Sequence, residues 1–363
     1  GFIVFNKHTY PHYLNLIEEL NVPYQESCMS FSVKCDRTGL EYNGTSFDTL
    51  FAQRRNFLNF KFWRMLADIF RFYRGAEDLL VSNDQRTLGQ FLKDDGYSNA
   101  FIEKHIVPMA AAVWSAPPSQ MMSFPLRYLL RFFHNHGFTK VNDRPQWYVI
   151  QGGSREYVRV LSEPLLDRIH LRSPVEGIRR HSDRVELTIG GKIHTFDQVI
   201  IACHSDTALK LLRDPTDAER SVLGAIPYQK NDVVLHQDAS IMPKATKAWA
   251  SWNYRLPEVG QGDATVTYWM NRLQGFAEDV PDFFVSLNQN DAIDSSKVLR
   301  SFVYHHPVYT DATLEAQKRH HEISGVNRTH YCGAYWFYGF HEDGVKSGLR
   351  VVAGLQGTKG DVR

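Results

Sequence analysis

The sequence lacks the features that define several large classes of protein. Its 363 residues include four cysteines, Cys28, Cys35, Cys203 and Cys332, and no Cys-x-x-Cys pair. This usage favours reduced thiols in an intracellular protein over a disulfide framework or a zinc site. No apolar run approaches the roughly 18 residues of a membrane-spanning helix, and no signal peptide is visible. We therefore expect an intracellular protein, either cytoplasmic or bound peripherally to a membrane.

An excess of charge of one sign is also missing. The 41 Lys and Arg residues are balanced by 40 Asp and Glu residues, which leaves a formal net charge of +1. No global basic field is present to attract nucleic acid by counterion release. We therefore expect no nucleic acid among the partners of this protein.

The motifs of hydrolytic and metal chemistry are absent as well. There is no G-x-S-x-G elbow, and the His-Ser-Asp run at 204–206 places its side chains in different directions because neighbours in sequence point apart. The histidines at 134 and 136, 305–306 and 320–321 lack the i,i+4 spacing of helical metal ligands. We expect neither a hydrolase triad nor a metal site.

The residues that are present predict a globular protein of about two domains. Hydrophobic residues make up 43% and charged residues 22% of the chain, an ordinary composition for a protein with a sizeable core. The first 140 residues show mainly helical spacing, with a hairpin signal at 31–42. Short alternating strands dominate from Trp147 onward, and the run at 199–202 is apolar throughout, as in a strand buried on both faces. The predicted fold class is α/β with mixed α+β character.

The most informative stretch is residues 331–350, with the sequence YCGAYWFYGFHEDGVKSGLR. A strand that ends in small residues lets a cofactor approach the backbone, and the start of the following helix offers N–H donors to an electron-accepting group. Gly344 and Gly348 would share one helix face and pack closely against a flat ring or a sheet. The negative charges of Glu342 and Asp343 would repel a phosphate bound there, but they would not repel a neutral ring. The same pattern also fits a crowded corner between a strand and a helix.

These residues resemble the C-terminal FAD motif of the flavin amine oxidase and phytoene desaturase superfamily. Two other segments agree with that resemblance: residues 151–154 resemble the double-glycine segment before a helix, which Ser154 would cap, and residues 174–175 with 199–204 resemble the adenine-contacting strand and the return strand. Within the superfamily, segments 1–6, 29–33, 248–254 and 333–348 look like amine-oxidase-like NAD/FAD-binding proteins associated with cyclopropane fatty-acid synthases. The likeness spans nearly the whole chain.

The resemblance implies a cofactor, FAD, and a set of residues that hold it. Those residues are Gly152, Gly153, Val175, Gly333, Ala334, Gly339, Asp343, Gly344 and Val345. Two departures stand out. The family's first βαβ unit carries G-x-G-x-x-G, which occurs nowhere in this sequence, so we expect Gly1 to follow that unit in a longer protein and FAD to be held weakly or not at all by this chain. Ala334 stands where many relatives have a carboxylate.

The resemblance further implies a discontinuous, Rossmann-like FAD/NAD(P)-binding domain that lacks its first βαβ. We assign residues 1–8, 145–225 and 325–363 to it. Residues 9–144 and 226–324 form the expected substrate domain, a helical block plus a mixed sheet.

The implied function is an FAD-dependent oxidoreductase that takes hydride from an apolar, fatty-acyl-like substrate, as in a desaturase, dehydrogenase or isomerase. Trp336 and Tyr338 are the expected pocket walls and His341 the group that handles protons; core packing is the alternative for each aromatic residue. A flavin amine oxidase is the second candidate, and a non-catalytic remnant acting as a binding or scaffold protein is the third.

Residues 57–74 interleave aromatic and basic side chains. This segment could lie on an anionic membrane surface and admit a lipid substrate. An amphipathic helix of the substrate domain with solvated arginines explains the same pattern.

Overall fold

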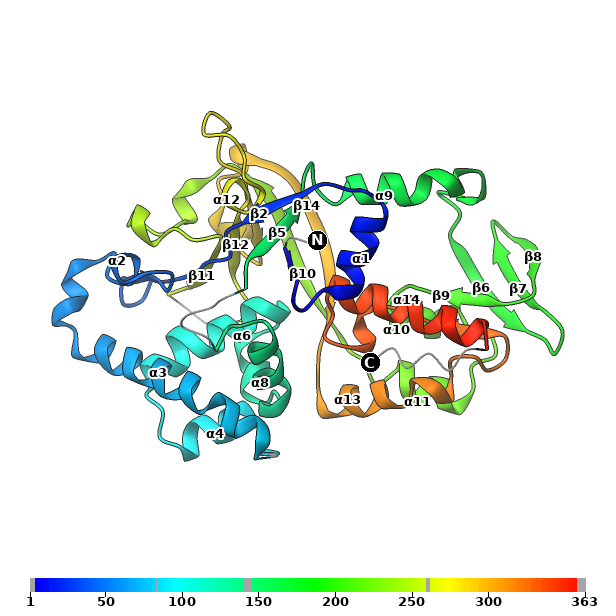
Figure 1. Cartoon of the computed structure of the whole chain (residues 1–363), viewed down its shortest axis with the longest axis horizontal. Helices are drawn as coiled ribbons and strands as arrows, with labels where there is room; N and C mark the ends of the chain where they lie inside the picture. Colours follow the sequence, from blue (N-terminus) through cyan, green and yellow to red (C-terminus); the bar gives the residue numbers. More distant parts are fainter. Residues whose placement is uncertain (1–3, 83, 140–144, 259–261, 358–363) are drawn as a thin grey trace.

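The computed structural model describes residues 4–82, 84–139, 145–258 and 262–357. Figure 1 shows a block of helices at one end, a sheet above and beside it, and a second lobe at the opposite end that carries the last helix of the chain. The mixed α/β class predicted from the sequence is confirmed, with helices and sheets in both parts and both parallel and antiparallel strand pairs.

The helical block is organised around α3 (Phe60–Val81). The side chain of Asn59 caps its start, accepting hydrogen bonds from the backbone N–H groups of Lys61 and Phe62 at 3.1 and 3.2 Å, which satisfies donors that have no partner inside the helix. Residues at helical spacing, among them Phe62, Leu66 and Phe72, are buried. The other helices of the block are α2 (Phe47–Leu50), α4 (Leu88–Asp94), α5 (Asn99–Phe101), α6 (Val107–Trp114), α7 (Pro118–Met122) and α8 (Leu126–Asn135). Between α5 and α6 the chain forms a π-helix, η2 (Ile102–Ile106).

A mixed sheet packs against this block. In the described part of the chain it has seven strands in the order β14-β10-β13-β12-β11-β3-β4, and only the β11–β3 pair is parallel. The strands are β3 (Phe31–Cys35), β4 (Leu40–Asn43), β10 (Tyr228–His236), β11 (Trp252–Leu256), β12 (Val266–Trp269), β13 (Phe284–Leu287) and β14 (Val298–Pro307). The hairpin predicted at 31–42 is confirmed as β3 and β4.

A smaller antiparallel sheet lies between the two parts of the molecule. Its strands are β1 (Phe5–Asn6), β5 (Trp147–Ile150) and β2 (Tyr24–Ser27), in the order β1-β5-β2. Helix α1 (Pro11–Glu19) follows β1 and lies beside the last helix, α14 (His341–Leu355) (Figure 1). The carboxylate of Glu342 accepts hydrogen bonds from the backbone N–H groups of His12 and Tyr13 at 3.1 and 2.8 Å, so a side chain of α14 caps the start of α1.

The second lobe contains two further small sheets. Strands β6 (Val175–Arg180), β7 (Val185–Ile189) and β8 (Lys192–Phe196) are antiparallel, and β9 (Val199–Ile201) pairs in parallel with β15 (Thr329–Tyr331). The helices of this lobe are α9 (Arg155–Ser162), α10 (Ser205–Leu211), α11 (Asp217–Leu223), α13 (Asp311–Lys318) and α14; α12 (Met270–Gln274) belongs to the sheet region. Short 3-10 turns complete the chain: η1 (Arg54–Leu58), η3 (Glu163–Arg168), η4 (Ala239–Ile241), η5 (Thr246–Ala248), η6 (Asn290–Ala292), η7 (Ser295–Lys297), η8 (His320–Glu322) and η9 (Ala334–Trp336).

A buried ion pair holds this second lobe together. The guanidinium of Arg180 donates two hydrogen bonds to the carboxylate of Glu219, at 2.6 and 2.9 Å, and a third to Asp214 at 3.0 Å. The hydroxyl of Tyr331 donates to the same Glu219 carboxylate at 2.6 Å. This network ties β6, α11 and β15 together, and a bidentate pair of this kind is both strong and directional.

Two details of the predicted fold are wrong. The apolar run at 199–202 is not buried on both faces: Ile200 is 48% exposed and its neighbour Ile201 4% exposed, so only one face of β9 is covered, because successive side chains of a strand point to opposite faces. Ser154 does not cap α9 through its side chain, because its own backbone is already helical, with φ −60° and ψ −22°.

The buried residues form two main clusters. The larger one joins the helical block and the large sheet, and the smaller one lies under β6, β9, β15 and α11. Phe5 and Val149, which the sequence places in the cofactor domain, pack in the larger cluster. The domain boundaries themselves remain a prediction.

Candidate functional site

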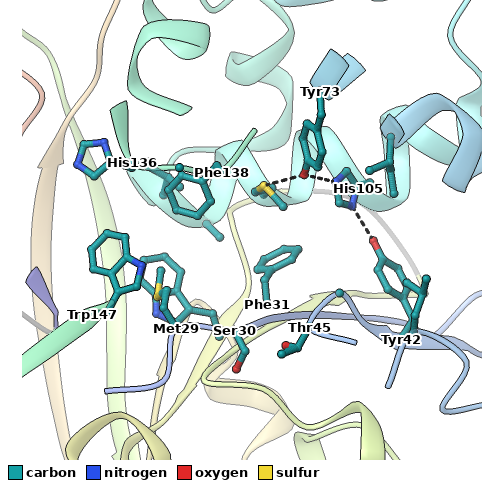
Figure 2. A pocket seen from close by; sticks show the side chains of 18 of the residues that line it. Met29, Ser30, Phe31, Tyr42, Thr45, Tyr73, His105, His136, Phe138 and Trp147 are labelled. Carbon is teal, nitrogen blue, oxygen red and sulfur yellow. Dashed lines mark hydrogen bonds between the residues drawn. The ribbon is translucent and has the colours of Figure 1, made fainter. Parts of the chain in front are cut away.

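Two neighbouring cavities share one wall. The first, which we call the α14 cavity, has a volume of about 660 Å³ and lies at the start of α14, with Tyr10, Tyr13 and Leu16 from the N-terminal segment also in its lining. The second, which we call the apolar chamber, has a volume of about 180 Å³ and lies between α3, α6 and the large sheet (Figure 2). Six residues line both cavities: Met29, Val113, His136, Phe138, Trp147 and Trp252. Among the described lining residues of either cavity, none is Asp, Glu, Lys or Arg.

The structure brings four of the predicted cofactor residues together. Ala334, Gly339, Gly344 and Val345 all line the α14 cavity. A Cβ placed on Gly344 would meet no other atom within 4 Å, so the first turn of α14 presents an open, flat face. Gly339 has φ +94°, and a Cβ there would lie 2.6 Å from the hydroxyl of Tyr309. Glycine is therefore required at 339 by both backbone conformation and space.

The other predicted cofactor residues lie outside the described lining of that cavity. Gly152 and Gly153 form the turn between β5 and α9, and Val175 begins β6. Gly333 precedes η9 and donates its N–H to the hydroxyl of Ser347 at 2.9 Å. That hydroxyl donates in turn to the carbonyl of Gly344 at 2.8 Å. Ser347 therefore fixes the loop after β15 to the first turn of α14.

Asp343 is buried beneath the start of α14. Its carboxyl accepts a hydrogen bond from the backbone N–H of Phe340 at 2.9 Å. Burial raises the pKa of Asp343 to about 7, against an ordinary value of 3.8. At neutral pH this carboxyl therefore carries less negative charge than an ordinary aspartate, and its electrostatic repulsion of an electron-rich ligand is weaker.

The α14 cavity fits a flat, neutral ring. The glycine face of α14, the aromatic walls and the lack of charged side chains among the described lining residues suit the isoalloxazine ring of FAD, and the helix start offers a partial positive charge. Ala334, Gly339, Gly344 and Val345 are the residues that would hold it. The described lining offers no Arg or Lys for the pyrophosphate.

The three predicted catalytic residues occupy different places. His341 lines the α14 cavity, where its Nε2 lies 2.9 Å from the hydroxyl of Tyr157. Burial lowers the pKa of His341 to about 4, so its imidazole is neutral at physiological pH. Trp336 is 2% exposed and packs edge-to-face on His320, with the ring centroids 4.6 Å apart. Tyr338 packs on Tyr128 at 4.6 Å. Neither Trp336 nor Tyr338 lines the two cavities.

Several cavity residues were not identified from the sequence. His136 lies at the shared wall, stacked on Phe132 with the centroids 3.9 Å apart, and burial lowers its pKa to about 4. Tyr42, Tyr73 and His105 lie together at the opposite side of the apolar chamber (Figure 2). Tyr73 belongs to the segment singled out for its aromatic spacing. No local signal marks His105, because its place in the chamber depends on the π-helix η2.

The predicted membrane segment, residues 57–74, has two faces. Leu66, Ile69, Phe70 and Tyr73 line the apolar chamber. Toward solvent the same region exposes a set of apolar side chains that we call the apolar patch: Phe47, Phe57, Leu58, Phe60 and Trp63, with exposed fractions from 40% to 93%. Phe51 lies beneath the patch and contacts three of its members, Phe47, Phe57 and Trp63. Arg54, Arg55, Lys61 and Arg64 are neighbours in sequence.

Neither a metal-binding cluster nor a membrane-spanning helix is present in the described part of the chain. Nowhere among them do three or more His, Cys, Asp or Glu side chains gather in a way that could hold a metal ion. None of the described helices combines the length and the hydropathy needed to cross a membrane.

Comparisons with known proteins agree with this geometry. Among solved structures, the chain is similar to cyclohexylamine oxidase from Brevibacterium oxydans IH-35A, with a TM-score of 0.65 and 13% identity over 96% of this chain and 86% of that one. It is similar to putrescine oxidase bound to putrescine (TM-score 0.67, 12% identity, 98% and 88% covered) and to a CLA-producing fatty acid isomerase from P. acnes (TM-score 0.60, 13% identity, 97% and 86% covered). These identities support the fold alone. No curated protein sequence matches the chain significantly.

The sequence itself matches one family model. The model for flavin containing amine oxidoreductases covers residues 1–237, well over half of the chain. The finer likeness to proteins associated with cyclopropane synthases remains a prediction. The chain belongs to the flavin-containing amine oxidoreductase family and, as predicted from its motifs, is an FAD-dependent oxidoreductase.

Proposed function

We propose that this protein oxidises or isomerises an apolar, fatty-acyl-like substrate held in the apolar chamber. The observation that carries the proposal is the shared wall: a chamber lined mainly by aliphatic and aromatic side chains adjoins the cavity in which the flavin ring fits. FAD, when bound, would supply an acceptor for hydride from a C–H bond of the substrate, including a C–H bond next to an amine nitrogen. Ala334, Gly339, Gly344 and Val345 would position it.

The chain's own residues have three tasks in this proposal. The apolar lining excludes water and orients a hydrocarbon chain. The shared wall, which includes Trp147 and Trp252, sets how far the substrate reaches into the α14 cavity. His341 is neutral, and its Nε2 lies 2.9 Å from the hydroxyl of Tyr157, so this pair places an uncharged hydrogen-bonding group at the wall of the α14 cavity.

A flavin amine oxidase is the second candidate. The aromatic residues of the shared wall, Phe138, Trp147 and Trp252, favour it, because aromatic faces attract cations. The lack of a carboxylate among the described lining residues disfavours it, because a buried ammonium group requires a compensating charge. This difference places the fatty-acyl substrate first.

Anaerobic mixing of the protein, first loaded with excess FAD, with each substrate class tests the proposal. Long-chain fatty acids or alcohols should bleach the visible absorbance of the bound flavin, and putrescine should not. Val113→Trp, which fills the shared wall, should abolish bleaching, while Val303→Trp on the exposed part of β14 should leave it unchanged. Bleaching by putrescine alone would replace the proposal with the amine oxidase.

We also propose that the affinity of this chain for FAD is weak. The described α14 cavity supports the ring, while G-x-G-x-x-G, which anchors the pyrophosphate in the family, is absent from these 363 residues. Titration with FAD, followed by quenching of flavin fluorescence, measures the affinity directly. A yellow protein that keeps its FAD through dialysis would refute this point. A colourless, folded protein that ignores added FAD would favour the binding or scaffold alternative.

We propose further that the apolar patch rests on an anionic membrane surface. Large apolar side chains next to four cationic residues suit the boundary between acyl chains and anionic head groups. The inner face of the same helix, α3, lines the apolar chamber, which gives a lipid a short route inward. Co-sedimentation with phosphatidylglycerol vesicles should fall for Leu58→Ser/Phe60→Ser and persist for the control Phe196→Ser on β8. Equal sedimentation of both variants would exclude this surface.

A further inference from the structure

A chain of hydrogen bonds lies at one side of the apolar chamber. The hydroxyl of Tyr42 donates to the backbone carbonyl of Lys104 at 2.7 Å. Its oxygen lies 3.0 Å from Nδ1 of His105, and Nε2 of the same ring lies 2.9 Å from the hydroxyl oxygen of Tyr73. Because a phenol has one proton and that of Tyr42 goes to Lys104, Nδ1 of His105 donates to Tyr42. In the neutral imidazole Nε2 then accepts the proton of Tyr73 at 2.9 Å, a shorter contact than the 4.0 Å from the same hydroxyl to Sδ of Met109, and the chain runs from Tyr73 to Lys104.

The surroundings make this cluster unusual. Most other lining residues of the chamber are apolar, among them Phe31, Leu50 and Met109. The two hydroxyl-bearing loop residues of the lining are engaged with their own neighbours: Ser30 accepts from the N–H of Ser251 at 2.9 Å, and Thr45 donates to Asn43 at 2.6 Å. A buried polar network whose hydrogen bonds are made holds its side chains in fixed positions.

The backbone at His105 supplies a second, independent observation. His105 is 5% exposed and lies in the π-helix η2, which joins α5 to α6. A π-helical turn is rare within a helix and occurs frequently at functional sites. It places the imidazole between Tyr42 of the sheet and Tyr73 of α3, two residues of separate elements.

The cluster and the shared wall lie on opposite sides of the chamber. In Figure 2, Tyr42, Tyr73 and His105 are grouped on one side, while Met29, His136 and Trp147 of the shared wall are on the other. A substrate held by the cluster would extend its hydrocarbon chain toward the shared wall. The carbon nearest the α14 cavity would then be remote from the polar end of the substrate.

We propose that Tyr73, backed by His105 and Tyr42, binds an uncharged, hydrogen-donating oxygen group, a hydroxyl or a protonated carboxyl, at the end of a long apolar substrate. This inference rests on the proposed function, since it names the polar end of that substrate. Tyr73 offers its oxygen as an acceptor because its proton points to His105. It is a binding residue, and His105 and Tyr42 are positioning residues that act through it.

Binding of matched ligands tests the inference without turnover. Calorimetric titration of the protein with 1-decanol and with its methyl ether compares a donor with a headgroup that cannot donate. The wild type should bind the alcohol about 10-fold more tightly. Tyr73→Phe should reduce that ratio to about 1 and leave the affinity for the ether unchanged, which also shows that the variant is folded. His105→Gln should give an intermediate ratio, and Tyr304→Phe, outside both cavities, the wild-type ratio.

The outcomes separate this inference from the proposed function. Equal affinities of the wild type for alcohol and ether, an unchanged ratio in Tyr73→Phe, or no binding of either ligand would overturn the anchor. A ratio that depends on Tyr73 supports the anchor even if no acyl compound bleaches the flavin, a result that would overturn the proposed function alone. With turnover, the double bond formed by the wild type should lie at one position, and Tyr73→Phe should scatter it.

Discussion

Replacing Asp343 with asparagine should change how the stability of the protein depends on pH. Burial raises the pKa of this carboxyl to about 7 from its ordinary value of 3.8, so the folded protein binds the proton more tightly than the unfolded chain does. A raised folded-state pKa contributes stability that is present at low pH and is lost as the pH rises from about 4 to about 7. Asparagine resembles the protonated form and has no proton to lose.

The magnitude follows from linkage. Between the two pKa values, the wild type should lose about 1.4 kcal/mol of stability for each pH unit through this one group. The interval from 3.8 to about 7 therefore corresponds to about 4 kcal/mol as an upper bound. Relative to the wild type, Asp343→Asn should gain stability steadily over this range and level off above about pH 7. The substitution can also change the free energy of unfolding by an amount that does not depend on pH. Such a change shifts the curve of stability against pH but does not alter its slope.

Urea unfolding of both proteins at pH 5, 6, 7 and 8 measures the difference. Asp238 supplies the matched control, because it is also buried but backbone N–H donors and Lys297 lower its pKa to about 2 despite its burial. Its carboxylate is ionised in both states above about pH 5, so Asp238→Asn should lose a constant amount of stability across the series. A difference between Asp343→Asn and wild type that stays flat with pH would refute the reasoning.

The remaining predictions concern stability and can be measured by urea unfolding. Arg180→Met leaves the buried carboxylate of Glu219 without its charge partner and should cost about 3–5 kcal/mol; a second change, Glu219→Gln, should recover part of this, and no recovery would contradict the ion-pair argument. Asn59→Ala removes the cap of α3 and should cost about 1 kcal/mol, whereas Asn59→Asp should retain most of the stability. Gly339→Ala places a Cβ against Tyr309 at a positive φ and should cost about 1–3 kcal/mol; an unchanged midpoint would show that the loop relaxes.

The sequence predicted features that depend on neighbouring residues. The helical spacing of apolar residues predicted α3, and the alternation of apolar and polar residues predicted β3 and β4. Both patterns can be read locally because they show which face of an element is buried. The glycines at 339 and 344 were identified from a local motif, and the structure places both on the α14 cavity. The sequence did not predict the exposure of Ile200, because the residues that cover each face of β9 come from distant parts of the chain.

Local sequence patterns could not predict the apolar chamber. Its polar cluster joins Tyr42, Tyr73 and His105, which are separated by 31 or more residues, since the closest pair spans 42 to 73. Trp336 fits the alternative of core packing that the sequence left open. An aromatic residue in a cofactor motif looked like a pocket wall, but its side chain fills the core under β15, where burial alone explains it.

The bond from Glu342 to the start of α1 joins residues that are 329 and 330 positions apart. Ribosomes add about 5–20 residues per second, so the N-terminal segment emerges many seconds before its partner. Before α14 is synthesised, Tyr13 lacks its contacts with Glu342 and His341, and the α14 cavity is incomplete. The α14 cavity therefore forms only after α14 has been synthesised, and a nascent chain halted before His341 would contain most of the helical block and the sheet but lack the α14 wall of this cavity.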